Sequence, residues 1–281
     1  MSEQIEQKAV NLGAPAAGDS SPPRTLLICH EGASLDQEGL GRWLASFSTL
    51  VGIVSLRETK GRERQRVKRE LKRVGPWRFL DVLAFRLYYK LFLAADDGRW
   101  QERKLGELRR TYPALRDVPV LTTHSPNSAE AEQFIRDRRP DLVLARCKTL
   151  LKESIFSIPT AGTFVMHPGI CPEYRNAHGC FWAIAEGDRD KVGMTLLRID
   201  KGVDTGPIYG YYSYDYDAAN ESHVVIQHRV VLDNLRELER KLLDTYHRRA
   251  APLDAAGRRS ATWGQPWLTK YARLKRRARR K

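Results

Sequence analysis

The stretch from Thr163 to Gly210 reads TFVMHPGICPEYRNAHGCFWAIAEGDRDKVGMTLLRIDKGVDTGPIYG. Its first residues predict a short apolar strand that ends on His167, followed by a loop rich in proline and glycine. The apolar residues between His178 and Glu186 indicate a helix. A second apolar strand, VGMTLLRI, then opens into the turn DKGVDTGP at residues 200–207. Strands that alternate with a helix in this way are typical of an α/β sheet.

Two side chains with useful chemistry follow these two strands. His167 stands at the end of the first strand, and Asp204 lies just past the end of the second. Ligands of an open α/β sheet bind outside the carboxyl ends of its strands. Gly202, Gly206 and Pro207 restrict the second loop, which would hold a carboxylate in one position. The pattern therefore predicts a site in which an imidazole and a carboxylate act together.

Three short motifs in this stretch add a resemblance to a known family. They are H-P-G-x-x-P-x-[YW]-R, A-x-x-x-G-D and V-G-[MV]-T, followed by DTGP, and the resemblance that they carry covers about a quarter of the chain. Together they resemble the core of the folate-dependent formyltransferases, which include glycinamide ribonucleotide, methionyl-tRNA and sugar N-formyltransferases. The family pattern is roughly N-x-H-P-S/G-x-x-P, with D-x-G-x-D-x-G-P further on. His167 and Asp204 match its catalytic His and Asp, whereas the position of its catalytic Asn holds Val165.

Formyl transfer to an amine makes clear demands on such a site. The reaction passes through a tetrahedral carbon whose oxygen takes negative charge, so the site must donate hydrogen bonds to that oxygen and accept a proton from the nitrogen. A protonated His167 beside an ionised Asp204 suits both needs. Valine cannot supply the donor of the family's Asn, and the loss of one such donor typically costs ~10²–10³ in rate. We expect Asn176 and His178 to act as catalytic groups in its place, with helix capping or surface exposure as the alternative for each.

The resemblance also implies a co-substrate, 10-formyltetrahydrofolate, and a small-molecule amine as the acceptor. The family lines its pterin pocket at the loop where this chain has Leu150 and Leu151. Asp200 and Val203, in the second loop, complete the expected cofactor-binding set. For the two leucines, a helix that packs on the sheet is an equal alternative. No metal ion is expected.

The expected fold is α/β: a Rossmann-like formyltransferase fold with a mostly parallel sheet of six or seven strands flanked by helices. Residues 1–23 are expected to be a disordered leader, and 24–213 the catalytic domain with a helical insertion at about 57–117. Residues 214–253 are expected to hold a C-terminal helix, from about 221 to 246, and 254–281 a basic tail.

The insertion contains apolar residues at helical spacing: Trp77, Leu80, Ala84, Leu87 and Leu91. The domain, a partner subunit as in a homodimer, or a membrane surface must cover them.

The basic residues of this chain gather in two segments. The net charge is +14, and Arg57–Arg73 together with Lys270–Lys281 carry the whole excess. The core itself therefore gives no sign of nucleic-acid binding, although the tail is a candidate contact for a polyanion. We expect deletion of 270–281 to leave the core folded.

The four cysteines form no CxxC pair, and no apolar run is long enough to span a membrane, so a cytoplasmic location is expected.

The leading hypothesis is an enzyme that transfers a formyl group from 10-formyltetrahydrofolate to a small-molecule amine. A second enzyme hypothesis is hydrolysis of the formyl donor, with water in place of the amine. The alternative outside catalysis is a catalytically impaired formyltransferase-like protein that binds a ligand or a polyanion. Val165 is the feature that keeps this last hypothesis open.

Overall fold

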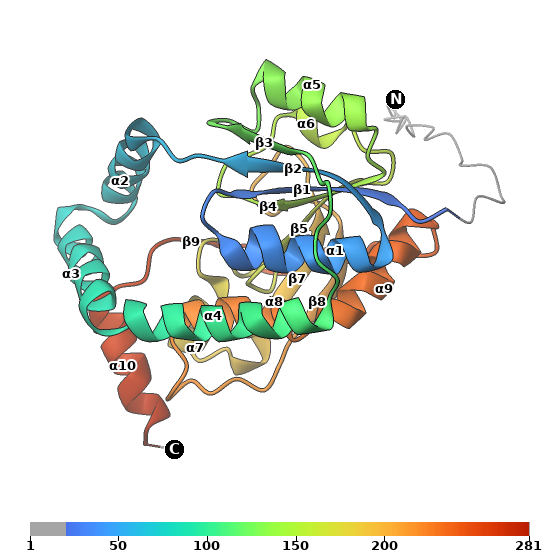
Figure 1. Ribbon diagram of the computed structural model, residues 1–281. Helices are drawn as coiled ribbons and strands as arrows, with labels where there is room; N and C mark the ends of the chain where they lie inside the picture. Colours follow the sequence, from blue (N-terminus) through green and yellow to red (C-terminus); the bar gives the residue numbers. More distant parts are fainter. Residues whose placement is uncertain (1–20, 281) are drawn as a thin grey trace, which may run out of the picture.

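A seven-stranded sheet is the centre of the molecule in the computed structural model, which describes residues 21–280 (Figure 1). The strands are β1 (Arg24–His30), β2 (Thr49–Leu56), β3 (Val120–Thr123), β4 (Leu142–Arg146), β5 (Gly162–His167), β7 (Met194–Arg198) and β8 (Ile208–Tyr212). Their order is β3-β2-β1-β4-β5-β7-β8. The first five strands are parallel, and β7 and β8 each run antiparallel to the preceding neighbour. The predicted mostly parallel, Rossmann-like α/β sheet is confirmed.

Helices cover both faces of this sheet (Figure 1). They are η1 (Leu35–Leu40), α1 (Gly41–Phe47), α2 (Lys60–Val74), α3 (Pro76–Phe92), α4 (Ala94–Thr111), α5 (Ala129–Arg138), α6 (Glu153–Phe156), α7 (Gly179–Glu186), η2 (Arg189–Lys191), α8 (His223–Leu232), α9 (Leu235–Tyr246) and α10 (Leu268–Ala278). A second, two-stranded sheet pairs β6 (Arg175–Asn176) with β9 (Thr262–Trp263). No helix within residues 21–280 is long and apolar enough to cross a membrane.

The side chains of β1 show how the sheet divides the core. Leu26 and Ile28 point into a cluster with residues of α5 and α6, whereas Leu27 and Cys29 point into a larger cluster with α1, α4, α7, α8 and α9. Successive side chains of a strand face opposite sides of the sheet, so an uninterrupted apolar strand is buried on both faces. This explains why RTLLIC has no polar alternation.

The segment predicted to be a helical insertion between the second and third strands contains α2, α3 and α4. Its last helix belongs to the main body, because Leu105 and Leu108 of α4 are buried in the larger core cluster. Helix α3 also contributes Phe85 to that cluster, and α2 and α3 extend along one edge of the molecule (Figure 1).

The structure corrects two expectations for the C-terminal part. The single helix expected from about 221 to 246 is two helices, α8 and α9. Asn234 separates them: its backbone leaves the helical conformation, and its side chain donates hydrogen bonds to the carbonyl groups of Ser213 and Val230. Side-chain bonds of this kind compete with a continuous helix.

The expected basic tail is also largely ordered structure. Residues 254–280 include β9 and α10, and Tyr271 and Leu274 of α10 are buried in the larger core cluster. Tyr271 lies 5.1 Å, centroid to centroid, from the ring of Phe85 in α3. Deletion of 270–281 would remove this packing and should lower the free energy of unfolding, while the expectation that the core still folds without the segment stays a prediction. Residues 1–20 of the expected leader lie outside the described residues, and the domain division itself stays a prediction.

Candidate active site

The structure brings His167 and Asp204 together. His167 ends β5 with only 5% of its surface exposed, and its Nδ1 lies 3.4 Å from Oδ2 of Asp204. Its other ring nitrogen, Nε2, lies 2.8 Å from the carbonyl oxygen of Tyr174. Both neighbours are acceptors, so an imidazolium, which donates at both nitrogens, satisfies them together. The imidazole and the carboxylate predicted from the sequence therefore form one pair, in which His167 is buried and Asp204 is partly buried.

The loop after β5 and the loop after β7 are tied to each other at this pair. The backbone N–H of Asn176 donates to Oδ2 of Asp204 at 2.8 Å, and the Arg175 guanidinium donates to the carbonyl oxygen of Val203 at 2.9 Å. Asn176, His178 and Asp204 all have positive φ angles, between 51° and 78°. Such backbone strain in non-glycine residues concentrates at functional sites, where the surrounding structure must enforce it.

Two glycines allow the loop after β5 to pack against the start of α7. A Cβ on Gly169 would lie 2.4 Å from the carbonyl oxygen of Tyr174 and 2.8 Å from Nε2 of His167. A Cβ on Gly179 would lie 2.5 Å from Cα of Gly169. Thr195 of β7 holds the same loop from the other side, because its hydroxyl donates to the Gly169 carbonyl oxygen at 2.6 Å. The position of the His167 ring therefore requires glycine, which has no side chain, at both 169 and 179.

The C-terminal part of the chain borders this site, which no pattern in the sequence predicted. Strand β9 pairs with β6, and the ring of Trp263 stacks on Tyr174 and on Trp182, at 5.5 and 4.9 Å between centroids. The indole N–H of Trp263 donates to the carbonyl oxygen of Glu173 at 2.9 Å. No sequence motif marks Trp263. Only its pairing in the folded chain places it beside the loop after His167.

An ion pair between Arg258 and the buried Glu173 holds the segment before β9 against the loop after β5. Glu173, 8% exposed, accepts two hydrogen bonds from Arg258, at 2.7 and 3.1 Å, and one from Lys191 at 3.1 Å. Burial by itself raises the pKa of this carboxyl group, but the hydrogen bonds from Arg258 and Lys191 outweigh burial, so the pKa lies below its ordinary value.

The two polar residues expected to replace the family's Asn lie in different surroundings. Asn176 contacts Asp204 through its backbone, and its side-chain amide donates to the Trp263 carbonyl oxygen. His178 precedes α7, with Nδ1 3.1 Å from the amide nitrogen of Gln227. Burial lowers the pKa of His178 to about 4, so its ring is neutral near pH 7. The structure thus joins Asn176 to the pair and gives His178 a hydrogen bond to α8 instead.

Val165 lies on the same side of β5 as His167, two residues away. It packs against an apolar cluster of Cys171, Leu197 and Ile208. Burial raises the pKa of the Cys171 thiol to about 12, which keeps it protonated. The position that holds Asn in the family pattern is therefore part of an apolar cluster in this chain.

The four residues expected to bind the cofactor divide into two groups. Leu150 exposes 58% of its surface, and Val203 is half-buried in the loop beside Asp204, so both present apolar surface. Leu151 is buried in the core cluster with α6, and the Asp200 carboxylate accepts bonds from the Gly202 N–H and the Thr205 hydroxyl. Leu150 and Val203 thus have side-chain surface available to a ligand, whereas Leu151 and Asp200 make contacts within the protein.

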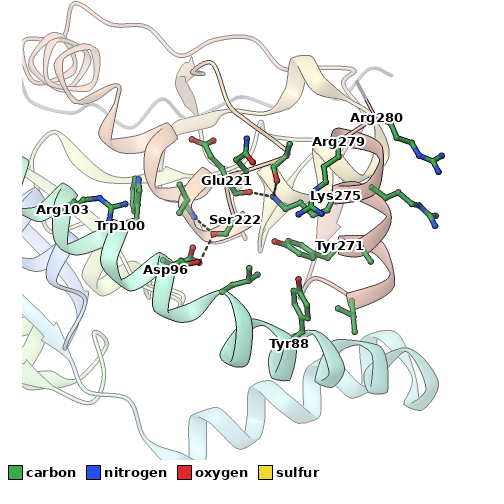
Figure 2. Close-up of a pocket in the computed structure, with 18 residues that line it drawn as sticks. Tyr88, Asp96, Trp100, Arg103, Glu221, Ser222, Tyr271, Lys275, Arg279 and Arg280 are labelled. Carbon is green, nitrogen blue, oxygen red and sulfur yellow. Dashed lines mark hydrogen bonds between the residues drawn. The ribbon is translucent and has the colours of Figure 1, made fainter.

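A separate cavity of about 720 Å³ opens between α4, α10 and residues 219–222 (Figure 2). Its lining includes Trp100, Tyr271 and Lys275 but neither His167 nor Asp204. The Lys275 ammonium donates to the carbonyl oxygens of Ala218, Ala219 and Glu221, and burial lowers its pKa to about 8. Its contacts show that Lys275 fixes the 219–222 loop against α10.

Comparison with known proteins agrees with the fold. The family model described as formyl transferase matches residues 101–241, half of the chain. The matched range contains β5, β7 and both catalytic candidates. The chain therefore belongs to the formyl transferase family, whose members transfer formyl groups, and the resemblance noted in the sequence is confirmed.

Individual relatives extend this result. A methionyl-tRNA formyltransferase from Kosmotoga olearia is 32% identical over 92 residues, which cover 32% of this chain and 29% of that protein. One from Pelobacter propionicus is 31% identical over 132 residues, which cover 43% of this chain and 41% of that protein. The aligned parts span less than half of each relative.

Solved structures show the shared fold over most of the chain. Glycinamide ribonucleotide transformylase 1 from Symbiobacterium toebii has a TM-score of 0.51 at 13% identity, covering 86% of this chain and 99% of that one. A sugar N-formyltransferase from a Shewanella species has a TM-score of 0.50 at 12% identity, covering 85% and 76%. At these identities the likeness shows the fold alone.

Proposed function

We propose that this protein transfers a formyl group from 10-formyltetrahydrofolate to an amine of a small-molecule acceptor. The observation that carries the proposal is the buried contact between His167 and Asp204, within the part of the chain that matches the formyl transferase family. The positive φ angles of Asn176 and Asp204 support it, because the fold maintains strained backbone at the point where the two loops meet.

In the proposed reaction His167 and Asp204 have separate tasks. Asp204 Oδ2 orients the imidazole, and Oδ1 has no hydrogen bond to another described residue, so it can accept the proton from the attacking amine. For His167 to donate to the developing oxyanion, a ring nitrogen must exchange a contact with Tyr174 or Asp204 for one with the formyl oxygen. Substrate binding would therefore replace one of these two contacts and leave the other in place.

The proposed donor would lie against the apolar surface of Leu150 and Val203. Asn127 would support Leu150, because its side chain bonds to both the Leu150 carbonyl oxygen and the Lys152 N–H, at 2.9 and 2.8 Å. The loop after β4 is thereby held in one conformation at the carboxyl end of the sheet, where ligands of such sheets bind.

A formyltransferase-like binding protein without turnover is the second candidate. Val165 favours it, because an apolar cluster occupies the position from which the family's Asn would donate. Under this alternative the loops and the folate surface serve binding alone. Donor hydrolysis, a homodimer, a polyanion contact of the C-terminal segment and a cytoplasmic location also stay predictions.

The deciding experiment incubates the protein with 10-formyltetrahydrofolate and pools of amines, and measures tetrahydrofolate and formylated products. We expect turnover that Asp204→Asn reduces by ~10³-fold or more, since it removes the proton acceptor and the charge beside His167. Asp137→Asn, an exposed carboxylate on α5, is the matched control and should keep full activity. Donor-induced thermal stabilisation without turnover would favour the binding protein, and tetrahydrofolate without a formylated amine would favour hydrolysis. If neither stabilisation nor turnover occurs, the proposal is wrong.

A further inference from the structure

Helix α3 has two apolar faces. Phe79, Val82 and Phe85 form the inner face and are buried. Leu80, Leu83, Leu87 and Leu91 form the outer face, where they expose 57%, 41%, 59% and 64% of their surface. Their spacing of three and four residues places these leucines on one stripe of the helix. The sequence predicted that a stripe of Trp77, Leu80, Ala84, Leu87 and Leu91 must be covered, yet within residues 21–280 its three leucines face solvent.

Two further exposed aromatic residues lie at the ends of α3, Trp77 beside the stripe and Phe92 on another side of the helix. Trp77, at the start of α3, exposes 85% of its surface, and Phe92, at the end, exposes 64%. Burial of one large apolar side chain contributes roughly 1.5–3 kcal/mol, so six exposed ones on a single helix give up considerable stabilisation. Contiguous apolar patches of this kind mark interaction sites.

Basic side chains border the stripe. Arg86 and Lys90 are exposed on α3 itself, and Lys68 and Lys72 are exposed on the neighbouring α2. Among the ion pairs between described residues, none includes any of these four. Helices α2 and α3 lie next to each other along one edge of the molecule, so these four cations and the stripe share that edge (Figure 1).

We infer that this edge binds the surface of an anionic lipid membrane, with the outer face of α3 inserted among the lipid headgroups. A helix that lies in a membrane interface combines an apolar stripe with flanking Lys and Arg, and interfacial Trp is typical of such helices. The cations attract anionic headgroups while the leucines enter the acyl boundary. The inference does not depend on the proposed transfer reaction.

The same residues disfavour two other occupants. A nucleic acid would pair with the cations but would leave Leu80, Leu87 and Leu91 uncovered. A second copy of this chain, packed about a two-fold axis through α3, would bring the unpaired cations of both copies together, and like charges repel. An anionic membrane satisfies the charges and the leucines at once.

The test measures co-sedimentation of the full chain with large unilamellar vesicles. We expect binding to equimolar phosphatidylcholine and phosphatidylglycerol vesicles, weaker binding at high salt, and much weaker binding to phosphatidylcholine alone. Leu87→Ser/Leu91→Ser should weaken binding by ~100-fold and Arg86→Gln/Lys90→Gln by ~10-fold or more. Val120→Ser, an equally exposed apolar residue on β3, is the matched control and should bind as the wild type does.

Fluorescence locates the contact on α3. Phosphatidylcholine brominated on its acyl chains should quench part of the tryptophan emission in mixed vesicles, and Trp77→Phe should remove most of that quenching while binding persists. Failure of the wild type to bind either vesicle would overturn the inference. So would binding that the double serine variant retains in full, which would indicate adsorption by charge alone, or a lipid-free dimer, seen by sedimentation velocity, that the same variant dissociates.

Discussion

His167 and Leu87 lie in opposite surroundings. His167 is a polar side chain almost fully buried, and each of its ring nitrogens has an acceptor within 3.4 Å. Leu87 is an apolar side chain with more than half of its surface in solvent. A buried polar group is costly unless it is paired, and an exposed apolar patch forgoes the stabilisation of burial. Polar side chains usually lie at the surface and large apolar ones in the core, and each of these two regions shows the reverse.

The difference teaches what each region is suited to do. Around His167 the fold provides partners for polar groups within the chain, so the geometry is fixed before any ligand arrives, as a catalytic site requires. On the outer face of α3 the fold provides no partner, so the missing contacts must come from outside. The first arrangement favours chemistry and the second favours binding.

The largest effect on stability should be the difference between a substitution on the inner face of α3 and one on its outer face. Phe85→Ala removes a ring that packs against Phe181, His223 and Tyr271, and should cost ~3–5 kcal/mol of unfolding free energy. Leu87→Ala, two residues away, should change it by less than ~0.5 kcal/mol. Urea unfolding of the two variants measures both values. Equal losses would mean that the outer face is packed in solution, contrary to the comparison.

The next effect concerns the loop at His167. Gly169→Ala would place a methyl group against the Tyr174 carbonyl oxygen and the His167 ring, and we expect a loss of ~2–3 kcal/mol together with most of the turnover. Gly106→Ala in α4 is the control, because its Cβ would meet only the end of Arg110 at 3.7 Å. The control should be stabilised by ~0.5–1 kcal/mol. A tolerated Gly169→Ala would show that the loop is looser than this packing implies.

A third prediction adds a polar group to the apolar cluster beside His167. Val165→Asn places an amide against Cys171, Leu197 and Ile208, and should cost about 2 kcal/mol because the amide lacks partners. Turnover should gain little, since the cluster holds the amide away from productive geometry. Val165→Ala separates the loss of apolar volume from the effect of the amide. A large rise in turnover would instead identify Val165 as the cause of a catalytic defect.

The smallest effect concerns Glu173. Its pKa is lowered in the folded state, so the ionised carboxylate contributes stability that is fully present above its ordinary value of 4.5 and is lost as the pH falls toward the folded value. Glu173→Gln should therefore cost about 1 kcal/mol at pH 7, and the difference from wild type should shrink below pH 4.5. Chemical unfolding at several pH values measures this difference. A stability difference that does not change with pH would show that the ion pair with Arg258 is not its source.

Much of the framework followed from local patterns. The apolar strands and the helix between His178 and Glu186 could be predicted because burial leaves continuous apolar runs in the sequence. His167 and Asp204 could be predicted as a pair because the carboxyl ends of neighbouring strands meet at one edge of a sheet. The break between α8 and α9 was missed, because the Asn234 side chain ends a helix here by reaching Ser213, and no local period records that contact.

The sequence by itself determined the sheet, the family and the two catalytic candidates, because each depends on residues close together in the chain or on strand ends that the topology must align. Only the tertiary structure decided that Trp263 and Arg258 border the site, that Val165 faces an apolar cluster, and that the leucine stripe of α3 is the uncovered face. These features depend on contacts between distant segments. Burial and pairing are properties of the folded chain, and a local pattern fixes the shape of an element but not its neighbours.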